Sequence, residues 1–363
     1  MKTVVTFGEI MIRLDMPDYR RIAQGMPGPV NTTFAGAEAN VAVSLSYLGG
    51  ESRFVTALPD NPLTDACLRT LTGLGVDTTG IVRTAAGRFG TYYVETGANQ
   101  RPSSVIYDRE LSSVSLTGTA TYPWNDIFAG AGWFHITGIT PALSSVAAEV
   151  SLFAVTEAKN RGLTVSCDLN FRKKLWRWEQ GRSPGALAGA TMRRLLPSVD
   201  LLIANEEDAA SVLGIQAEET DIEAGVLAVS KYPDVARKIV TEFPTIRMVA
   251  ITLRESFSAT HNNWGAMLYD AETDTAYFAP REDGVYAPYE IRAIVDRVGG
   301  GDSFAAALIF ALSTPELKAP EHAVAFAAAA SCLAHSIPGD FNFSTRQEVE
   351  ALMKGAASGR VLR

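Results

Sequence analysis

The segment Ile294–Leu312, with the sequence IVDRVGGGDSFAAALIFAL, carries the residues best suited to chemistry in this chain. Its three glycines, Gly299, Gly300 and Gly301, stand directly before a run of small and apolar residues that predicts a helix. Glycine lets the backbone turn tightly, so several N–H groups can converge on one point at the positive end of the helix dipole. Such a point binds an anion, most naturally a phosphoryl group.

Asp302 follows these glycines at once and places a carboxylate beside the predicted phosphoryl position. Like charges repel, so this carboxylate is unsuited to binding phosphate itself. It is suited to orienting a hydroxyl group and accepting its proton late in phosphoryl transfer. The alternative is structural: Asp302 or Ser303 caps the helix, and the glycines only form a tight turn. The segment taken alone favours neither interpretation.

Other common motifs of nucleotide or metal chemistry are missing from the sequence. It contains no Walker A pattern (GxxxxGK[ST]) and no GxGxxG, which removes the main support for a P-loop or dinucleotide-binding protein. Its three cysteines form no CxxC, and its four histidines show no zinc-ligand spacing. A zinc site and a disulfide framework are therefore not expected.

Length and charge narrow the class of protein further. The chain has 363 residues, a net charge of −8, 47% hydrophobic and 20% charged residues. These values predict a folded protein of about two domains, or one large core with an appendage. The negative charge argues against nucleic acid or a membrane surface as a partner. Sparse cysteines, the lack of a signal-peptide pattern and no apolar run longer than Phe304–Leu312 predict a cytoplasmic protein.

The elements that position the glycine-rich segment follow from an alternation of strand and helix patterns. Short buried strands are predicted at Thr3–Phe7, Arg53–Ala57, Trp133–Ile136, Thr164–Asp168, Leu201–Ala204 and Met248–Leu253. Helices are predicted at Ala37–Leu48, Pro62–Leu74, Ser144–Arg161, Pro184–Leu196, Glu206–Leu213 and Val235–Phe243. This alternation predicts an α/β protein with a mostly parallel sheet covered by helices on both faces.

Two stretches, 11–34 and 87–122, interrupt the alternation. They contain segments in which polar and apolar residues alternate, such as Thr91–Glu95 and Ser104–Tyr107. They flank a clear αβα unit. We predict that both excursions form one small β-rich lid over a cleft. The alternative is that they only decorate an edge of the main sheet. The predicted core then consists of residues 1–10, 35–86 and 123–363.

The residues at 299–304, GGGDSF, resemble the GAGD signature of the PfkB (ribokinase-like) family of carbohydrate kinases, with Gly300 in place of alanine. Residues 35–40, AGAEAN, resemble the family's N-terminal signature, and Asn205–Asp208 resembles its NxxE motif. These signatures stand in the family's order along the chain. The resemblance implies a ribokinase-like three-layer α/β sandwich with a small β-rich lid. It also implies ATP-dependent phosphorylation of a sugar with Mg²⁺, catalysed by Asp302.

Within that family the sequence is similar to 2-keto-3-deoxygluconate (KDG) kinases at Tyr107–Arg109, Asp168–Trp176 and Ile337–Asn342. The similarity implies that Tyr107 and Arg109 hold the carboxylate and keto end of a sugar acid, and that Arg172 contacts substrate or nucleotide. A carboxylate favours a planar guanidinium, which supports this assignment. Fructose, ribose and 2-keto-3-deoxygalactonate remain alternative substrates. A non-catalytic sugar-binding protein on this fold is a further alternative.

The family signature implies a sugar side of the cleft formed by Gly36, Ala37 and Asn40. Glycine lets the backbone approach hydroxyl groups, and Asn40 offers a donor and an acceptor. The structural alternative is that these residues only begin a helix. The position of Glu9 implies a polar group that faces the cleft.

The resemblance also implies a nucleotide side. The predicted contacts are Asn170, Arg172, Asn205, Thr252, Arg254, Ser256, Gly299, Gly301 and Phe326. Thr252–Ser256 stands where the family has a TxG loop, and Arg254 replaces the glycine, so a charged donor would reach a phosphate. Phe326 stands where many relatives place an Asn beside the adenine; it would pack on the base or in the core.

Metal ions and assembly complete what the resemblance implies. Asp208 is one methylene shorter than the family's Glu, so it would act on Mg²⁺ through a water molecule. Asp296 stands where the family often places residues of a monovalent-cation site, but Arg297 replaces the usual Thr, so a requirement for K⁺ is open. Homo-oligomers through the lid are expected because its edge strands would otherwise stay unpaired.

Overall fold

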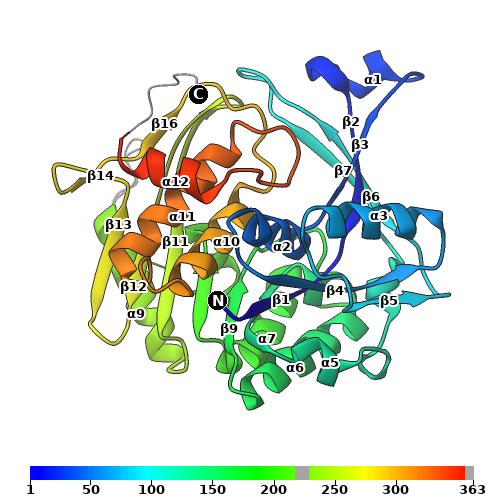
Figure 1. Cartoon of the computed structure of the whole chain (residues 1–363), viewed down its shortest axis with the longest axis horizontal. Coiled ribbons are helices and arrows are strands. Elements are labelled where there is room, and N and C mark those ends of the chain that lie inside the picture. The colour runs from blue at the N-terminus through cyan, green and yellow to red at the C-terminus, as the bar shows by residue number, and fades with distance from the viewer. Residues whose placement is uncertain (217–228, 356–363) are drawn as a thin grey trace.

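A ten-stranded sheet runs through the computed structural model, which describes residues 1–216 and 229–355 (Figure 1). The strand order is β13-β12-β11-β10-β9-β8-β1-β4-β5, and β16 pairs with β12. The strands from β11 to β5 are parallel, whereas β12 runs antiparallel to β11, β13 and β16. Two parts of the predicted core segment 123–363, residues 217–228 and 356–363, lie outside the described residues.

All six predicted strands are present in this sheet. The parallel strands are β1 (Thr3–Phe7), β4 (Ser52–Pro59), β5 (Ile81–Thr84), β8 (Ala131–Thr137), β9 (Thr164–Asp168), β10 (Leu201–Ala204) and β11 (Met248–Ser258). The strands that the sequence analysis missed are mostly the antiparallel ones: β12 (His261–Asp270), β13 (Thr275–Ala279) and β16 (Tyr289–Ile291). A short hairpin of β14 (Arg281–Glu282) and β15 (Val285–Tyr286) lies outside the main sheet.

The segment Thr252–Ser256, predicted as a loop, belongs to the long strand β11. It pairs with β12 in a register that places Thr252 opposite Ala266 and Arg254 opposite Trp264. Phe257–Trp264 is therefore the turn of a hairpin and the start of β12. Backbone hydrogen bonds to an antiparallel neighbour replace the glycine loop that the family motif implied.

Helices cover both faces of the sheet, which confirms the predicted three-layer α/β sandwich. One face carries α6 (Ser145–Asn160), α7 (Pro184–Leu195) and α9 (Tyr232–Glu242), and the other carries α2 (Ala37–Tyr47), α10 (Gly300–Leu312) and α11 (Pro320–Ala334) (Figure 1). The remaining longer helices are α3 (Pro62–Gly73) and α12 (Arg346–Met353). Predicted helix Glu206–Leu213 is a short α8 (Glu206–Asp208) followed by one π-helical turn, Ala209–Leu213.

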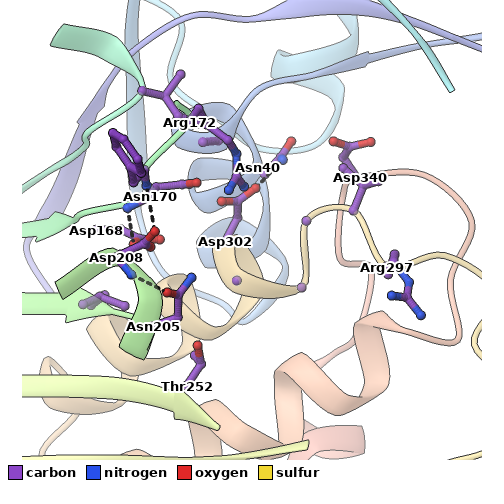
Figure 2. A pocket seen from close by; sticks show the side chains of 18 of the residues that line it. Asn40, Asp168, Asn170, Arg172, Asn205, Asp208, Thr252, Arg297, Asp302 and Asp340 are labelled. Atoms are coloured by element: carbon purple, nitrogen blue, oxygen red, sulfur yellow. Dashed lines mark hydrogen bonds between the residues drawn. The ribbon is translucent and has the colours of Figure 1, made fainter. Parts of the chain in front are cut away.

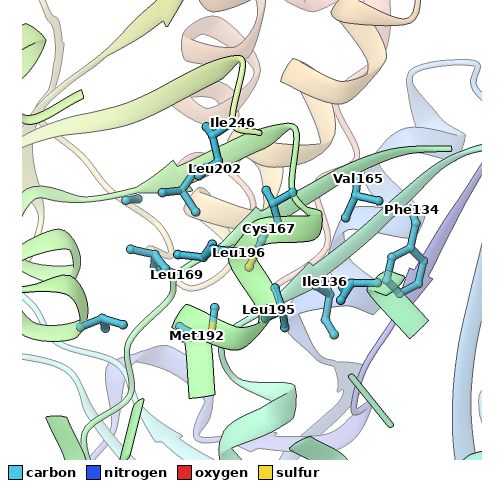
Figure 3. Packing of buried hydrophobic residues seen from close by; sticks show 14 of the residues in the cluster. Phe134, Ile136, Val165, Cys167, Leu169, Met192, Leu195, Leu196, Leu202 and Ile246 are labelled. Carbon is cyan, nitrogen blue, oxygen red and sulfur yellow. The ribbon is translucent and has the colours of Figure 1, made fainter. Parts of the chain in front are cut away.

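Apolar packing between strands and helices stabilises this frame. Figure 3 shows Met192, Leu195 and Leu196 of the α7 region against Cys167 of β9 and Leu202 of β10. All five side chains are buried to 2% exposure or less. Because central strands are buried on both faces, they are nearly continuous apolar runs, which is why they were recognisable in the sequence.

A separate four-stranded sheet contains the two excursions, in the order β3-β2-β6-β7. Its strands are β2 (Met11–Asp15), β3 (Asn31–Ala35), β6 (Gly90–Glu95) and β7 (Ser104–Asp108). It shares no strand pairing with the main sheet, so it is not an edge decoration. Val114 and Tyr122, at the end of the second excursion, pack instead in the main core beside α5 (Trp124–Phe128). The division into a core and a lid stays a prediction.

Within the described ranges, no helix has both the length and the apolar character needed to cross a membrane. The three cysteines are free thiols.

Candidate active site

A cavity of about 480 Å³ lies where the small sheet, the carboxyl ends of parallel strands and the first turn of α10 meet. In an open α/β sheet, ligands bind at the carboxyl ends of the strands. The volume is within the range of small-molecule sites. Most of the predicted site residues line this cavity; these are Gly36, Ala37, Asn40, Tyr107, Arg109, Asn170, Arg172, Asn205, Asp208, Thr252, Arg254, Gly299, Gly300, Gly301 and Asp302.

The glycine segment forms the start of α10. Gly299 is the N-cap, with a φ of 82° in the left-handed region that favours glycine. A Cβ atom at Gly299 would lie 2.2 Å from the carbonyl oxygen of Asp340, so no side chain fits there. Gly300, Gly301 and Asp302 follow in the first turn, whose N–H groups have no carbonyl partner within the helix. Neither Asp302 nor Ser303 caps the helix.

Asp302 is held in place by Asn40 of α2. The Asn40 Nδ2 donates to Asp302 Oδ2 at 2.6 Å, and Asn40 Oδ1 accepts from the Gly36 amide at 3.1 Å. Burial raises the pKa of Asp302 to about 7; the Asn40 hydrogen bond and the Arg172 charge oppose this rise. A general base with a pKa near the pH of the reaction is largely ionised and still has a useful affinity for a proton. Asn40, predicted to contact the sugar, thus orients the carboxylate in this structure.

The backbone at Gly36 passes very close to the first strand. A Cβ atom at Gly36 would lie 2.0 Å from the carbonyl oxygen of Glu9, so only glycine allows this approach. Gly36 is also the N-cap of α2 and precedes Ala37, which lines the cavity. The predicted sugar side is therefore a helix start that packs directly beside the end of β1.

Arg109 and Tyr107 lie at the end of β7 and face the cavity together. The Arg109 guanidinium lies 5.3 Å from the centroid of the Tyr107 ring and forms an ion pair with Glu9. Arg109 is 9% exposed and Tyr107 46% exposed. Arg109 Nε and Glu9 Oε1 have no hydrogen-bond partner among the described residues. Arg109 is thus a buried, paired cation whose buried Nε has no partner among the described residues, which is not the state of a solvated surface arginine.

Two carboxylates lie close together in the cavity, Asp168 at the end of β9 and Asp208 in α8, which follows β10 (Figure 2). Asp168 Oδ1 accepts from the Asn170 amide at 3.1 Å, and Asp208 Oδ1 accepts from the Phe171 amide at 3.2 Å. Burial raises the pKa of Asp208 to about 6. Burial, with the Asp208 charge, raises the pKa of Asp168 well above its usual range. Two carboxylates that repel each other favour a bound cation.

These carboxylates are suitable ligands for the Mg²⁺ that accompanies ATP, because Mg²⁺ prefers oxygen. No group of three or more His, Cys, Asp or Glu suited to a metal occurs in the described part of the chain. Mg²⁺ at Asp168 and Asp208 would therefore complete its shell with phosphate oxygens and water. The sequence analysis proposed only Asp208. Asp168 had a recognisable signal, an acidic residue at the last position of a buried strand.

The hairpin of β11 and β12 forms the far wall of the cavity. Arg254 is exposed and forms no ion pair with a described residue, and Arg297 lines the same wall. Asn262 is 1% exposed, and both of its amide atoms lack a partner among the described residues. The Trp264 Nε1 also lacks one. The sequence analysis missed Asn262 and Trp264 because their strand was not recognised.

Two predicted nucleotide contacts do not line the cavity. Ser256 lies farther along β11 and is exposed. Phe326 is 0% exposed, and its ring stacks on Phe310 at a centroid distance of 5.7 Å. Phe326 belongs to the apolar layer between α11 and α10, so its burial leaves no surface for an adenine.

A family profile described as pfkB family carbohydrate kinase matches residues 1–242. The chain belongs to the PfkB family of carbohydrate kinases. It is therefore a sugar kinase with a sugar and ATP as small-molecule partners, and PfkB kinases in general use ATP with Mg²⁺.

Some individual relatives of this PfkB kinase are similar over nearly its whole length, and others over about half of it. A 2-dehydro-3-deoxygalactonokinase from Haloferax volcanii is 33% identical over 98% of both chains. A 2-dehydro-3-deoxygluconokinase from Bacillus subtilis is 31% identical over 47% of this chain and 52% of its own. The crystal structure of a 2-dehydro-3-deoxygluconokinase from Thermotoga maritima is 42% identical, with a TM-score of 0.86 over 98% of this chain and 100% of its own.

Asp296, the residue where the PfkB resemblance implied a monovalent cation, does not fit that group. Its Oδ2 accepts from Arg13 Nη2 at 2.5 Å and from the Gly339 amide at 3.1 Å. Its Oδ1 accepts from the amides of Arg297 and Val298 at 2.8 and 3.1 Å. Both carboxylate oxygens are thus fully used by protein donors, and a buried arginine supplies the positive charge.

Proposed function

We infer that this kinase phosphorylates KDG at its terminal hydroxyl with ATP and yields 2-keto-3-deoxy-6-phosphogluconate and ADP. One observation carries the inference: a single cavity is lined by Asp302 at the start of α10 and by Tyr107, Arg109 and Arg172. Asp302 and the helix start suit phosphoryl transfer. Tyr107 and the two arginines suit a carboxylate, which a sugar acid has and a neutral sugar lacks.

In this proposal, the small sheet holds the acid end of the substrate. Arg109 offers its unpartnered Nε, and the neighbouring Tyr107 offers a hydroxyl group. Arg172 is exposed to the cavity and forms no ion pair with a described residue, so its guanidinium is available for the substrate or the nucleotide phosphates. The ion pair with Glu9 would orient Arg109 before the substrate arrives.

The transfer step then uses the opposite end of the substrate. Asp302 accepts the proton of the terminal hydroxyl, whose oxygen forms a bond to the γ-phosphorus as the bond from that phosphorus to the ADP oxygen breaks. The first-turn amides at Gly300 and Gly301 stabilise the charge on the transferred group. Asp168, and Asp208 directly or through water, would hold Mg²⁺, which would supply positive charge to offset the nucleotide phosphates.

The nucleotide would lie along the wall formed by the β11 and β12 hairpin. We propose Asn170, Asn205, Thr252 and Arg254 as its contacts, since all four line the cavity on that side. Asn262 is added to them because a buried, unpartnered amide is costly unless a ligand satisfies it.

The small sheet would act as a lid and as a contact between subunits. Its edge strand β7 exposes Ile106 by 54% and Tyr107 by 46%. An unpaired edge with apolar side chains favours pairing with a second copy. We propose a homo-oligomer through this edge, which light scattering of the wild type and of Ile106→Lys would test. A monomeric wild type would refute this contact. A cytoplasmic location stays a prediction consistent with the free thiols.

The experiment that tests the proposed function is ADP release with Mg·ATP on KDG, 2-keto-3-deoxygalactonate, fructose, ribose and no sugar, with Asp302→Asn in parallel. We expect the highest kcat/KM on KDG and loss of activity in Asp302→Asn. Preference for a neutral sugar would refute the acid-binding assignment of Tyr107, Arg109 and Arg172. Unchanged activity in Asp302→Asn would refute the assigned base.

The second candidate substrate is 2-keto-3-deoxygalactonate, favoured by the relative from Haloferax volcanii that matches over 98% of this chain. Both sugar acids carry the same carboxylate and keto group, so Arg109 serves both in the same way. The ratio of the two kcat/KM values in the panel decides between them.

A further inference from the structure

We propose that Arg13 is the built-in cation of this kinase: its guanidinium takes the place of a monovalent cation at Asp296 and ties the small sheet to the phosphoryl-binding turn. The proposal rests on the assigned role of the turn at Gly299–Asp302. It predicts phosphoryl transfer without a requirement for K⁺.

The first observation is the burial of the Arg13 side chain and its pairing with three carboxylates. Arg13 is 1% exposed although it lies on β2, a strand of the small outer sheet. Its Nη1 donates to Asp340 Oδ1 and its Nη2 to Asp296 Oδ2, both at 2.5 Å, and its Nε donates to Asp15 Oδ1 at 3.3 Å. A guanidinium is buried at this depth only when carboxylates pair with it.

The second observation is that the donors around Asp296 leave no position for another cation. Asp296 accepts four hydrogen bonds, two at each oxygen, from Arg13 and from the amides of Arg297, Val298 and Gly339. An ionised carboxylate has about four acceptor positions.

Two backbone carbonyl oxygens, a type of ligand for K⁺, are also occupied by the side chain of Arg297, which follows Asp296. Arg297 Nη2 donates to the carbonyl oxygens of Ser258 and Ala259 at 3.0 and 2.5 Å. Two arginines therefore satisfy oxygen atoms that a hydrated ion would otherwise need.

The third observation links Arg13 to the phosphoryl side of the cavity. Asp296 binds the amides of the two residues that lead into Gly299. The carbonyl of Asp340 packs against Gly299 so closely that no Cβ fits. Arg13 thus holds the loops on both sides of the turn, and loss of its charge would leave two buried carboxylates without compensation.

The fourth observation links the same guanidinium to the sugar side. Arg13 lies opposite Tyr92 in the parallel pairing of β2 and β6. The Tyr92 hydroxyl donates to Asp340 Oδ1 at 2.7 Å, and Tyr92 and Met11 both line the cavity. The ring of Tyr92 lies 5.8 Å from that of Tyr107. A movement of the small sheet over the substrate would therefore reach the turn through Arg13, which makes Arg13 a positioning residue.

The test begins with the wild-type protein and the best sugar of the panel. ADP release is measured with ATP as its Tris salt, in tetramethylammonium chloride, KCl or NaCl at equal ionic strength. We expect the same rate in all three salts. A saturable rise with K⁺ would overturn the proposal, and this measurement needs no variant to fold.

Variants then separate a cation role from a packing role. Arg13→Met and Arg13→Ala should lower kcat by about 10- to 100-fold, a loss typical of residues that orient a site from behind. K⁺ or methylguanidinium should restore part of the kcat of Arg13→Ala, whereas packing alone predicts no such rescue. The matched control is Arg83→Met, because Arg83 also bridges two carboxylates, Asp60 and Asp65, but on the surface. Its kcat should not change.

A binding measurement makes this test independent of turnover. In a thermal shift titration, K⁺ should raise the melting temperature of Arg13→Ala above that in tetramethylammonium, and should not do so for the wild type. A K⁺-specific shift in the wild type, or full kcat in Arg13→Met, would refute the built-in cation. If no sugar is turned over, the proposed function fails, while the titration still decides the role of Arg13.

Discussion

The two sides of the cavity are built in different ways. On the proposed phosphoryl side, Gly299 to Asp302 are consecutive residues at the start of one helix. On the proposed sugar side, Tyr107 and Arg109 come from the small sheet, and Arg109 pairs with Glu9, 100 residues earlier in the chain. The first side is a local backbone conformation, and the second is an assembly of charges across elements. We therefore expect damage to the first to abolish the reaction and damage to the second to change its substrate.

The largest effect is expected at Asp302. Asp302→Asn should lower kcat by about 10²- to 10⁴-fold, the usual contribution of a general base. The fold should persist, because the amide keeps the shape and one acceptor for the Asn40 Nδ2. ADP release and the melting temperature measure the two properties.

The control for this substitution is Asp60→Asn, which removes an exposed carboxylate far from the cavity and should leave kcat unchanged. A kcat of Asp302→Asn close to the wild-type value would show that the reaction does not depend on the Asp302 carboxylate, and would contradict the expected difference between the two sides of the cavity.

A smaller and more selective effect is expected on the sugar side. Arg109→Met should lower kcat/KM for the sugar acid by about 10- to 100-fold, since a lost charge-assisted hydrogen bond costs about 1.5–3 kcal/mol. The rate on a neutral sugar should fall much less. The substitution leaves the buried Glu9 carboxylate without its paired cation, so it is made together with Glu9→Gln.

The matched control for Arg109 is Arg88→Met, which removes an arginine that pairs with Asp108 at the surface of the same sheet. Equal losses on acidic and neutral sugars would mean that Arg109 only stabilises the small sheet.

The next effect is on the pH dependence of kcat/KM, which should change tenfold per pH unit on the acidic side of its inflection. Burial raises the pKa of Asp302 to about 7, and the Asp340 and Glu38 charges add to this rise, while Asn40 and Arg172 oppose it. The carboxylate must be ionised to accept a proton. We therefore expect kcat/KM for the sugar to fall as the pH decreases below about 7 and to be level above it.

The inflection is assigned to Asp302 by removing one of its neighbours. Asn40→Ala deletes a hydrogen bond that favours the ionised form, so the inflection should move to higher pH. A profile that is flat through neutral pH, or an inflection unmoved in Asn40→Ala, contradicts the assignment.

The smallest effect is expected away from both sides, in the apolar layer. Phe326→Leu should lower the free energy of unfolding by about 1 kcal/mol, since it exchanges one apolar side chain for a smaller one. KM for ATP should stay at the wild-type value because Phe326 is fully buried against Phe310. A marked rise in the KM for ATP would indicate that Phe326 contacts the nucleotide. Chemical denaturation and initial rates measure the two quantities.

The sequence alone determined the features that depend on neighbouring residues. The glycines before Asp302 predict a helix start, and the apolar runs predict six of the seven parallel strands and most of the helices between them. The structure contains these elements because backbone conformation and period-2 or period-3.6 burial are properties of short segments. The antiparallel strands β12, β13 and β16 at one end of the sheet were not predicted, although Trp264–Tyr269 of β12 is a buried run.

Only the tertiary structure decided which distant charges meet. Asn40 and Asp302 are 262 residues apart, and Arg13 is 283 residues from Asp296 and 327 from Asp340. Phe326, which the motif allowed at the nucleotide or in the core, is in the core. A short segment carries no information on its distant partners, because folding selects them by burying each charge only where another neutralises it. The glycine turn and the helix start that carries Asp302 were therefore predictable, whereas the groups that orient them were not.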